Sequence, residues 1–300
     1  MVTPNFSYSP EVHDARAANK PIVALESTVI AHGLPRPQNL ETAQRLEALV
    51  KESGSIPATI AILEGQLTVG LTSDQVRFIA DSGDIKKISI RDLPIAVAQN
   101  WNGATTVAST SWIAARAGIK VFATGGIGGV HRGSLPDISA DLPVLASTSI
   151  IVVCSGAKIV LDLPATREWL ETNGITVVGY GCDEMPAFYS RGSGLPIDTR
   201  CDSPAAVAEI FHAQAALGIN RALLVTVPVP PEFEVPATLL EDTLSEALDQ
   251  AQRQLITGRQ LTPFLLSHMA QVSGGATLRA NIALLENNAR VAAQIAAALG

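Results

Sequence analysis

The chain has 300 residues, and its content of 47% hydrophobic and 16% charged residues is that of a folded globular protein rather than a disordered one. Its formal net charge of −7 and the lack of any long Lys/Arg cluster exclude a nonspecific binder of nucleic-acid polymers. Three widely spaced cysteines without a CxxC pair argue against a disulfide framework or a zinc site and favour a reducing compartment.

The beginning of the chain carries neither the basic start nor the apolar run of a signal peptide. No stretch of about 20 uninterrupted apolar residues occurs, so no membrane span is expected. These features predict a cytoplasmic protein without a membrane partner. We expect residues 1–20 to form an N-terminal extension and residues 21–300 to form a single domain.

Short β-branched runs alternate with longer amphipathic runs along the chain. Predicted strands cover residues 22–25, 59–63, 87–90, 120–123, 150–154, 176–179 and 222–226. Predicted helices cover residues 38–52, 73–81, 104–117, 139–147, 165–173, 204–217, 236–254, 263–272 and 278–299. This alternation predicts an α/β fold of the α/β/α layered kind, with a central, mostly parallel sheet flanked by helices. Ligands bind at the carboxyl ends of the strands in such sheets, so the residues that follow each strand are the first to consider for function.

The first predicted strand leads into the sequence ALESTVIAHGLPRPQN, where apolar and small residues surround Glu26. Burial disfavours a charged carboxylate, so the pKa of an unpaired Glu at this position would be raised. A raised pKa prepares a general acid for neutral pH. The sequence leaves equally open a structural Glu that an Arg or backbone amides satisfy.

Lys158 follows the fifth predicted strand, in the sequence IIVVCSGAKIVLD. A lysine that enters a helix from the end of an apolar strand is partly desolvated, which favours the uncharged amine. An uncharged amine can attack a carbonyl carbon and form a Schiff base. The alternative is a lysine at the start of a helix whose ammonium group reaches the solvent.

A glycine-rich turn, ATGGIGGVHRGS, follows the fourth predicted strand and places His131 and Arg132 directly after the glycines. Glycines let backbone amides approach an anion closely, so this turn suits a phosphate. The spacing GGIGG does not match the dinucleotide pattern GxGxxG. The alternative is an ordinary tight turn between a strand and a helix.

Asp137 and Asp141 stand four residues apart in the sequence PDISADLPVLA, with Ser139 between them. A helix that starts here would place both carboxylates on one face. Carboxylates near a phosphate site suit a hard cation such as Mg²⁺ or Mn²⁺. Helix capping by one acid and solvent exposure of the other are the alternative.

Two further segments carry polar groups that suit a ligand. Lys87 begins the third predicted strand, and hydroxyl side chains surround the predicted helix start near Val107, where amides and hydroxyls can hold anions. Asn281 interrupts a largely apolar helix. A carboxamide both donates and accepts hydrogen bonds, as recognition of a pyrimidine edge requires, although such asparagines are more often structural.

Several unusual strings follow one another from Pro21 onward: ALEST, HGLPRPQN, GATTVAST, VFATGGIGGVHRG, DISADL, GAK followed by LD, TPFLL and NNA. Their order resembles that of the pseudouridine-5′-phosphate glycosidase family. The resemblance implies a single catalytic domain that splits the C–C glycosidic bond of pseudouridine 5′-phosphate. The expected products are uracil and ribose 5-phosphate, and the reaction is expected to be reversible.

The same resemblance implies a role for each matching residue. Lys158 would be the nucleophile that forms a Schiff base with C1′ of the opened ribose, Glu26 the general acid, and Asp137 the ligand of one Mn²⁺ per subunit. The implied contacts with the small-molecule substrate are Lys87, Val107, Ser139, Ala140 and Asp141, with His131 and Asn281 as further pocket residues. The family also implies a homotrimer.

The chain departs from the family pattern at three places. The segment 134–136, before the aspartates, is shorter than usual, which would shift Asp137 relative to the glycine-rich turn. Ile159 stands where the family often has a small Ser, and Ser155 replaces a common Ala. None of these changes removes a group that would react.

Three other functions share part of this pattern. A class I aldolase-like lyase would use the Schiff-base lysine but would release no uracil from pseudouridine 5′-phosphate. A noncatalytic nucleotide sensor would bind without turnover, and a sugar kinase would consume ATP. Uracil release therefore separates the glycosidase from all three.

Overall fold

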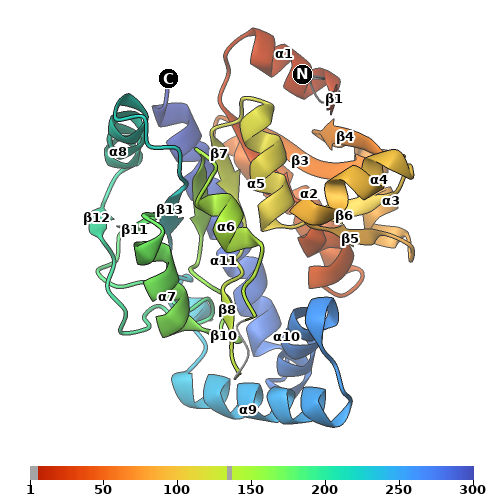
Figure 1. Cartoon of the computed structure of the whole chain (residues 1–300), viewed down its shortest axis with the longest axis vertical. Helices are drawn as coiled ribbons and strands as arrows, with labels where there is room; N and C mark the ends of the chain where they lie inside the picture. Colours follow the sequence, from red (N-terminus) through yellow and green to blue (C-terminus); the bar gives the residue numbers. More distant parts are fainter. Residues whose placement is uncertain (1–5, 134–136) are drawn as a thin grey trace.

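The structure is a computed structural model that describes residues 6–133 and 137–300, so the short segment 134–136 lies outside the described residues (Figure 1). Its strands are β1 (Phe6–Tyr8), β2 (Ile22–Glu26), β3 (Ile56–Leu63), β4 (Gln66–Val69), β5 (Lys86–Ile88), β6 (Gly103–Thr105), β7 (Val121–Ala123), β8 (Val130–His131), β9 (Ile151–Cys154), β10 (Leu161–Asp162), β11 (Thr176–Tyr180), β12 (Thr199–Cys201) and β13 (Leu223–Thr226).

Its α-helices are α1 (Pro10–Ala17), α2 (Gln38–Glu52), α3 (Ser73–Asp81), α4 (Leu93–Ala98), α5 (Val107–Arg116), α6 (Asp141–Leu145), α7 (Leu163–Thr172), α8 (Pro204–Ala216), α9 (Ala237–Arg253), α10 (Leu261–Val272) and α11 (Ala276–Ala298). Four short turns complete the elements: the π-helix η1 (Val29–Gly33) and the 3₁₀ turns η2 (Ile90–Asp92), η3 (Pro231–Phe233) and η4 (Gly258–Gln260).

One large sheet organises the described part of the chain. Its main path runs β1-β4-β3-β2-β7-β9-β13-β11-β12, with β6 beside β3 and β5 beside β6. The run from β2 to β12 is parallel throughout, whereas β4 and β6 pair antiparallel with β3. Strands β7, β9 and β13 are buried along their whole length, as expected for parallel strands covered on both faces.

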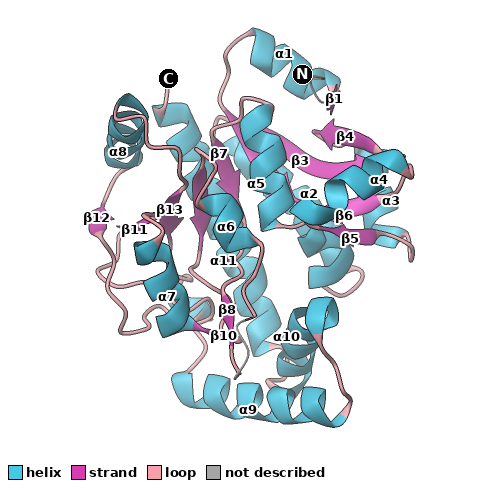
Figure 2. Ribbon diagram, in the orientation of Figure 1, coloured by secondary structure: helices cyan, strands magenta, loops and turns pink. Residues whose placement is uncertain are grey.

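Helices cover both faces of this sheet (Figures 1 and 2). Helices α2, α8 and α11 pack together on one face, and α5, α6 and α7 lie on the other. Helices α9 and α10 pack against each other beyond the lower end of the sheet in Figure 1. The predicted α/β/α layered fold with a mostly parallel sheet is therefore confirmed.

The segment predicted to be an N-terminal extension contributes to this sheet. Strand β1 pairs parallel with β4, and α1 contacts β3 and β2. Val12 of α1 is fully buried. The domain boundary at residue 20 stays a prediction, but residues 6–17 share the core of the rest of the chain.

Two predicted helices are shorter than expected. The predicted helix 104–117 begins only at Val107, because the preceding residues form β6 and Thr106 and Ser109 make a capping box. The predicted helix 139–147 is reduced to α6, which begins at Asp141.

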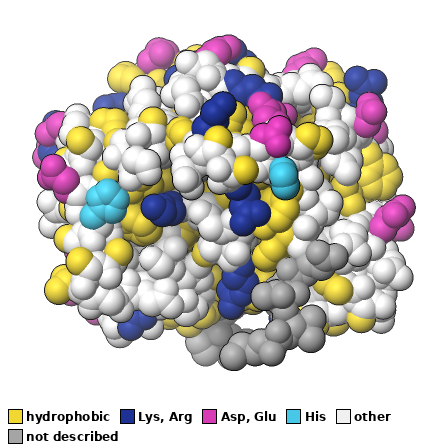
Figure 3. All heavy atoms as spheres, turned by 90° about the horizontal axis from the view of Figure 1, so that it is seen from above, with side chains coloured by type: hydrophobic (Ala, Val, Ile, Leu, Met, Phe, Trp, Pro, Cys, Tyr) yellow, Lys and Arg dark blue, Asp and Glu magenta, His cyan; other side chains and the backbone are white. Residues whose placement is uncertain are grey.

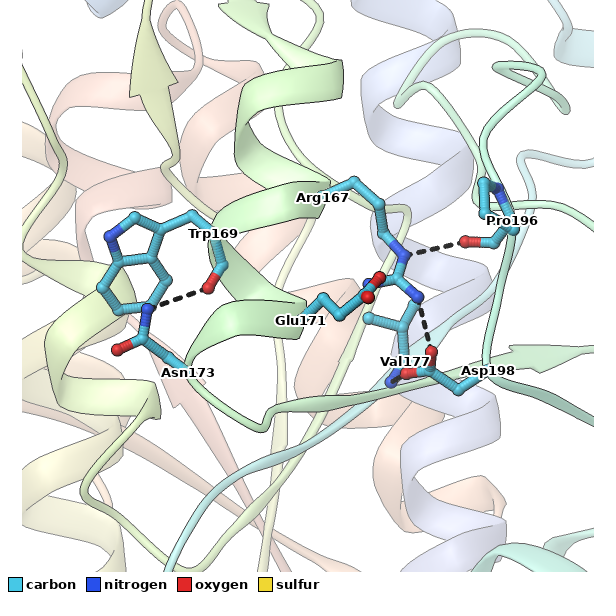
Figure 4. A network of polar contacts seen from close by, with 7 residues as sticks. All are labelled: Arg167, Trp169, Glu171, Asn173, Val177, Pro196 and Asp198. Carbon is cyan, nitrogen blue, oxygen red and sulfur yellow. Dashed lines mark hydrogen bonds and ion pairs between the residues drawn. The ribbon is translucent and has the colours of Figure 1, made fainter.

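An ion pair between the buried Arg167 and the partly exposed Asp198 fixes the edge of the sheet near α7 (Figure 4). The Nη2 atom of Arg167 lies 2.5 Å from Oδ1 of Asp198, and Arg167 Nε donates to the carbonyl of Pro196 at 2.8 Å. The second oxygen of Asp198 accepts the backbone amide of Val177 at 2.7 Å. These contacts attach the loop before β12 to α7 and β11.

The face seen from above carries α1 and the C-terminus (Figure 3). Lys and Arg side chains gather along its middle, and Asp and Glu side chains lie mostly toward its edge. Arg16, Lys20 and Lys120 border a shallow hollow at this end, where β2 and β7 begin. Within residues 6–133 and 137–300, no helix combines the length and the apolar character that crossing a bilayer requires.

Candidate active site

A cavity of 440 Å³ opens at the carboxyl ends of strands β2, β7 and β9. This is the position that the parallel sheet predicts for a ligand site. All ten residues proposed from the sequence line it: Glu26, Lys87, Val107, His131, Asp137, Ser139, Ala140, Asp141, Lys158 and Asn281. They come from elements spread over the whole chain, so the fold brings together what the sequence keeps apart.

Glu26, the last residue of β2, lies in the wall of this cavity and is only 7% exposed. Its Oε1 accepts a hydrogen bond from Thr124 Oγ1 at 2.7 Å, and its Oε2 accepts one from Thr28 Oγ1 at 2.8 Å. Burial raises the pKa of Glu26 and outweighs the opposing effects of the Lys158 charge and of the two hydroxyls. A carboxyl that keeps its proton beyond the usual range is suited to act as an acid.

Lys158 lies in the loop between β9 and β10, half-buried, and not at the start of a helix as the sequence predicted. Its backbone N–H donates to the carbonyl of Ile127 at 3.1 Å. Gly156 has φ +81°, and a Cβ there would lie 2.1 Å from the carbonyl oxygen of Pro186. The loop therefore packs between the segments of Ile127 and Pro186, and Lys158 forms part of the cavity wall.

The glycine-rich turn packs tightly beneath the cavity. A Cβ on Gly126 would lie 2.7 Å from the ring of Phe188, and one on Gly129 would lie 2.4 Å from Thr166 Oγ1. The N–H of Gly128 donates to Asp141 Oδ2 at 2.8 Å. Close packing thus accounts for these glycines, and binding of a phosphate by this turn stays a prediction.

Asp141 begins α6 and is buried. Besides the amide of the glycine-rich turn, it accepts the backbone N–H of Ala108, near the start of α5, at 2.9 Å. One carboxylate therefore ties two walls of the cavity together. Contact of Asp141 with a substrate stays a prediction.

Asp137 is exposed and precedes α6, so the predicted shared helical face with Asp141 is wrong. The helix begins four residues later than that argument required. A different contact places Asp137: its carbonyl accepts the backbone N–H of His131 at 2.8 Å. Both aspartates still line the same cavity.

Three other predicted residues reach the cavity from separate elements. Lys87 belongs to β5, Val107 is the first residue of α5, and Asn281 lies in α11. The amino-terminal end of α5 carries the positive end of its helix dipole and faces the cavity, which favours an anion there.

The sequence did not single out His32, Phe188 or Thr262, which also line the cavity. His32 begins the string HGLPRPQN, in the turn between β2 and α2, so its place at the carboxyl end of a strand was a usable signal. Phe188 adopts φ 63°, a left-handed conformation that a local sequence pattern does not reveal. Thr262 belongs to α10, which packs beyond the sheet.

The metal prediction can be compared with the side chains present. Over the described ranges, no group of three or more His, Cys, Asp or Glu side chains could hold a metal ion. Asp137 could supply one carboxylate ligand at the cavity, where water and a bound phosphate would complete the coordination, as is usual for ions of the Mg²⁺ type. Such a site fits an ion that binds together with its substrate.

The fold and this cavity define an α/β enzyme with a buried carboxyl and a lysine at the strand ends. A family model described as indigoidine synthase A like protein matches residues 11–298. The chain belongs to this family.

Relatives with curated names give a more specific comparison than the family model does. The pseudouridine-5′-phosphate glycosidase of Methylobacterium nodulans is 48% identical over 100% of this chain and 89% of its own length. The enzyme of the same name from Geobacillus kaustophilus is 48% identical over 96% of this chain and 97% of its own length. The resemblance to pseudouridine-5′-phosphate glycosidases is therefore confirmed.

Two solved structures share the whole fold. An indigoidine synthase A-like protein from Thermotoga maritima superposes with a TM-score of 0.90 at 36% identity, covering 99% of this chain and 97% of that one. The prealnumycin C-glycosynthase AlnA, in complex with ribulose 5-phosphate, superposes with a TM-score of 0.90 at 40% identity, covering 98% of this chain and 96% of that one.

Proposed function

We propose that this chain is a glycosidase that cleaves the C–C bond of pseudouridine 5′-phosphate and releases uracil and ribose 5-phosphate. One observation carries the proposal: Glu26 and Lys158 face one cavity, and burial raises the pKa of the Glu26 carboxyl even with a lysine near it. The names of the curated relatives support the substrate. The ribulose 5-phosphate bound to AlnA supports a phosphorylated sugar as ligand.

The bond to be broken explains why the site needs an amine. Ordinary glycosidases protonate a leaving oxygen and stabilise an oxocarbenium-like transition state between two carboxylates. In pseudouridine the leaving atom is a carbon, which carries no lone pair to protonate. A nitrogen on C1′ supplies the electrons that the cleavage requires, and Lys158, which lines the cavity, would provide it.

The proposed steps balance atoms and charge. Glu26 gives its proton to the ring oxygen as the uncharged Lys158 amine attacks C1′, so a C–N bond forms and the C1′–O4′ bond breaks. The new ammonium nitrogen then returns a proton to the Glu26 carboxylate and regains its lone pair, and the Glu26 carboxyl gives this proton to C5 of uracil. The nitrogen lone pair forms the C1′=N double bond while the electrons of the C1′–C5 bond return to the pyrimidine ring. Water hydrolyses the resulting imine and releases ribose 5-phosphate and the free lysine.

We also propose one Mn²⁺ per subunit, a homotrimer and a cytoplasmic location, which follow from the resemblance. Asp137 would contribute a carboxylate to the ion, and the ion would neutralise charge at the phosphate end of the substrate. Metal analysis of the purified protein and light scattering test the first two proposals directly.

The test of the reaction has two readouts. Uracil release from pseudouridine 5′-phosphate is followed by ultraviolet absorbance, and Lys158→Ala is expected to lower the rate by several powers of ten. Borohydride reduction with ribose 5-phosphate is expected to add the reduced sugar to Lys158, as read by peptide mass. Lys86→Ala is the matched control, because Lys86 lies on the same strand as Lys87 but outside the cavity and is exposed.

Three results would contradict the proposal. No uracil release by the wild-type protein would refute the reaction. An adduct that persists in Lys158→Ala would refute the nucleophile. Loss of trapping in Lys86→Ala would show that the adduct forms at a lysine outside the cavity.

A further inference from the structure

A rare helical turn places His32 in the cavity wall. The π-helix η1 (Val29–Gly33) follows Glu26 after two residues, and π-helical turns are frequent at functional sites. The buried side chain of Asn39 donates to the carbonyl of Ile30 at 3.0 Å and to that of Ala80 at 3.0 Å. The turn is thus fixed from outside, and the position of His32 does not depend on a ligand.

One ring nitrogen of His32 lacks a partner. The Nε2 atom is buried and has no hydrogen-bond partner within the described residues. Buried polar atoms in native structures are almost always paired, so each exception needs an explanation. A ligand in the 440 Å³ cavity that His32 lines would supply the missing partner.

The ring offers an acceptor rather than a donor. Burial lowers the pKa of His32, and the positive charge of Lys87 lowers it further. The ring is therefore neutral at pH 7, where one ring nitrogen donates and the other accepts, so the unpartnered Nε2 can present a lone pair to a ligand. A phosphate dianion or a carboxylate has no proton to give to this lone pair, whereas a hydroxyl has.

We propose that His32 Nε2 accepts a hydrogen bond from a secondary hydroxyl of the bound sugar phosphate and thereby selects the ribose configuration. This inference rests on the proposed function, which brings a sugar phosphate into the cavity. His32 is then a specificity residue that contacts the sugar but takes no part in bond cleavage.

The test pairs changes in the protein with changes in the sugar. Dissociation constants are measured by calorimetry for ribose 5-phosphate, 2-deoxyribose 5-phosphate and xylose 5-phosphate, which lacks the ribose configuration at C3. His32→Leu removes the acceptor, and His32→Gln keeps an acceptor near the position of Nε2. Melting temperatures of both variants report whether the fold is intact.

His32→Leu is expected to weaken ribose 5-phosphate binding by about 3- to 30-fold, the range of one hydrogen bond, with partial recovery in His32→Gln. At least one of the two altered sugars is expected to lose less than about 2-fold, because its hydroxyl contact is already absent. That sugar identifies the hydroxyl that His32 binds.

Equal losses for all three sugars, or no loss for ribose 5-phosphate, would overturn the proposal. If His32→Leu does not fold, the comparison of His32→Gln with His32→Asn decides, because the shorter amide mimics Nδ1 instead of Nε2. The binding assay needs no turnover, so its outcome is separate from uracil release, and failure of one is distinguishable from failure of the other.

Discussion

Replacing Asp141 by Ala is expected to destabilise the protein more than any exposed acidic substitution. Its two oxygens accept the buried amides of Gly128 at 2.8 Å and Ala108 at 2.9 Å. Each buried amide left without a partner costs about 1–3 kcal/mol, so the loss is about 2–6 kcal/mol in total. Removing a carboxylate that had to be desolvated offsets part of this cost. We therefore expect a loss of about 2–4 kcal/mol in the free energy of unfolding.

The assay is urea unfolding at pH 7, read by circular dichroism, with equal slopes required for the comparison. Asp137→Ala is the matched control, since this aspartate lines the same cavity but is exposed. It is expected to change the free energy of unfolding by less than about 0.5 kcal/mol. A loss below about 1 kcal/mol for Asp141→Ala would refute the claim that its carboxylate holds the two walls together.

Three further predictions follow from single contacts. Glu26→Gln should lower turnover by about 10²- to 10⁴-fold. Burial raises the pKa of Glu26 above 4.5, so the wild-type protein loses stability as the pH rises through this raised pKa and the buried carboxyl becomes charged. Glu26→Gln cannot ionise and should therefore be more stable than wild type at pH 8, but not at pH about 4. Urea unfolding at the two pH values measures this difference. Asp198→Ala should cost about 1–3 kcal/mol in thermal unfolding, since the buried Arg167 keeps as its ion pair only the longer 3.5 Å contact with the exposed Glu171, and a loss no larger than that of Arg167→Met would contradict this. Gly156→Ala should cost about 1–3 kcal/mol or more, because φ is +81° and the new Cβ meets Pro186, and unchanged uracil release would show that the loop does not position the lysine.

The central strands could be predicted because they are buried on both faces. A strand such as β9 must then be apolar at every position, and IVVC shows this directly in the sequence. Helices α2 and α3 were predicted with their observed bounds, since each has a clear apolar stripe between breakers. The local sequence pattern was sufficient to predict a strand or helix wherever burial determined which of its residues are apolar.

The sheet edge could not be predicted in the same way. Strand β6 has the sequence GAT, without a β-branched apolar run, and it is a strand only because it pairs with β3 and β5. Strand β4 follows β3 through a tight hairpin in which Glu64 and Gly65 have φ of 48° and 76°. Both strands depend on partners rather than on their own composition.

The residues that line the site were predicted more completely than the hydrogen bonds that these residues make. Glu26 and Lys158 could be found because each follows an apolar strand whose end lies at the ligand side of the sheet. The role of Asp141 as a link between two walls could not be found, because it depends on amides 13 and 33 residues away along the chain. His32 was missed because its orientation depends on a π-helical turn, which has no periodicity to detect.

Glu26, Asp137 and Asp141 line one cavity, and the surroundings of each carboxyl group suit it to a different task. The partners of Glu26 are the hydroxyls of Thr28 and Thr124, which can donate to a carboxylate and can also accept from a protonated acid. Both protonation states of Glu26 therefore find partners without any backbone movement, as a group that gives and regains a proton requires. The partners of Asp141 are backbone amides, which can only donate, so its contacts suit a fixed structural link. Asp137 is exposed to solvent, so its oxygens would be accessible to the cation proposed above.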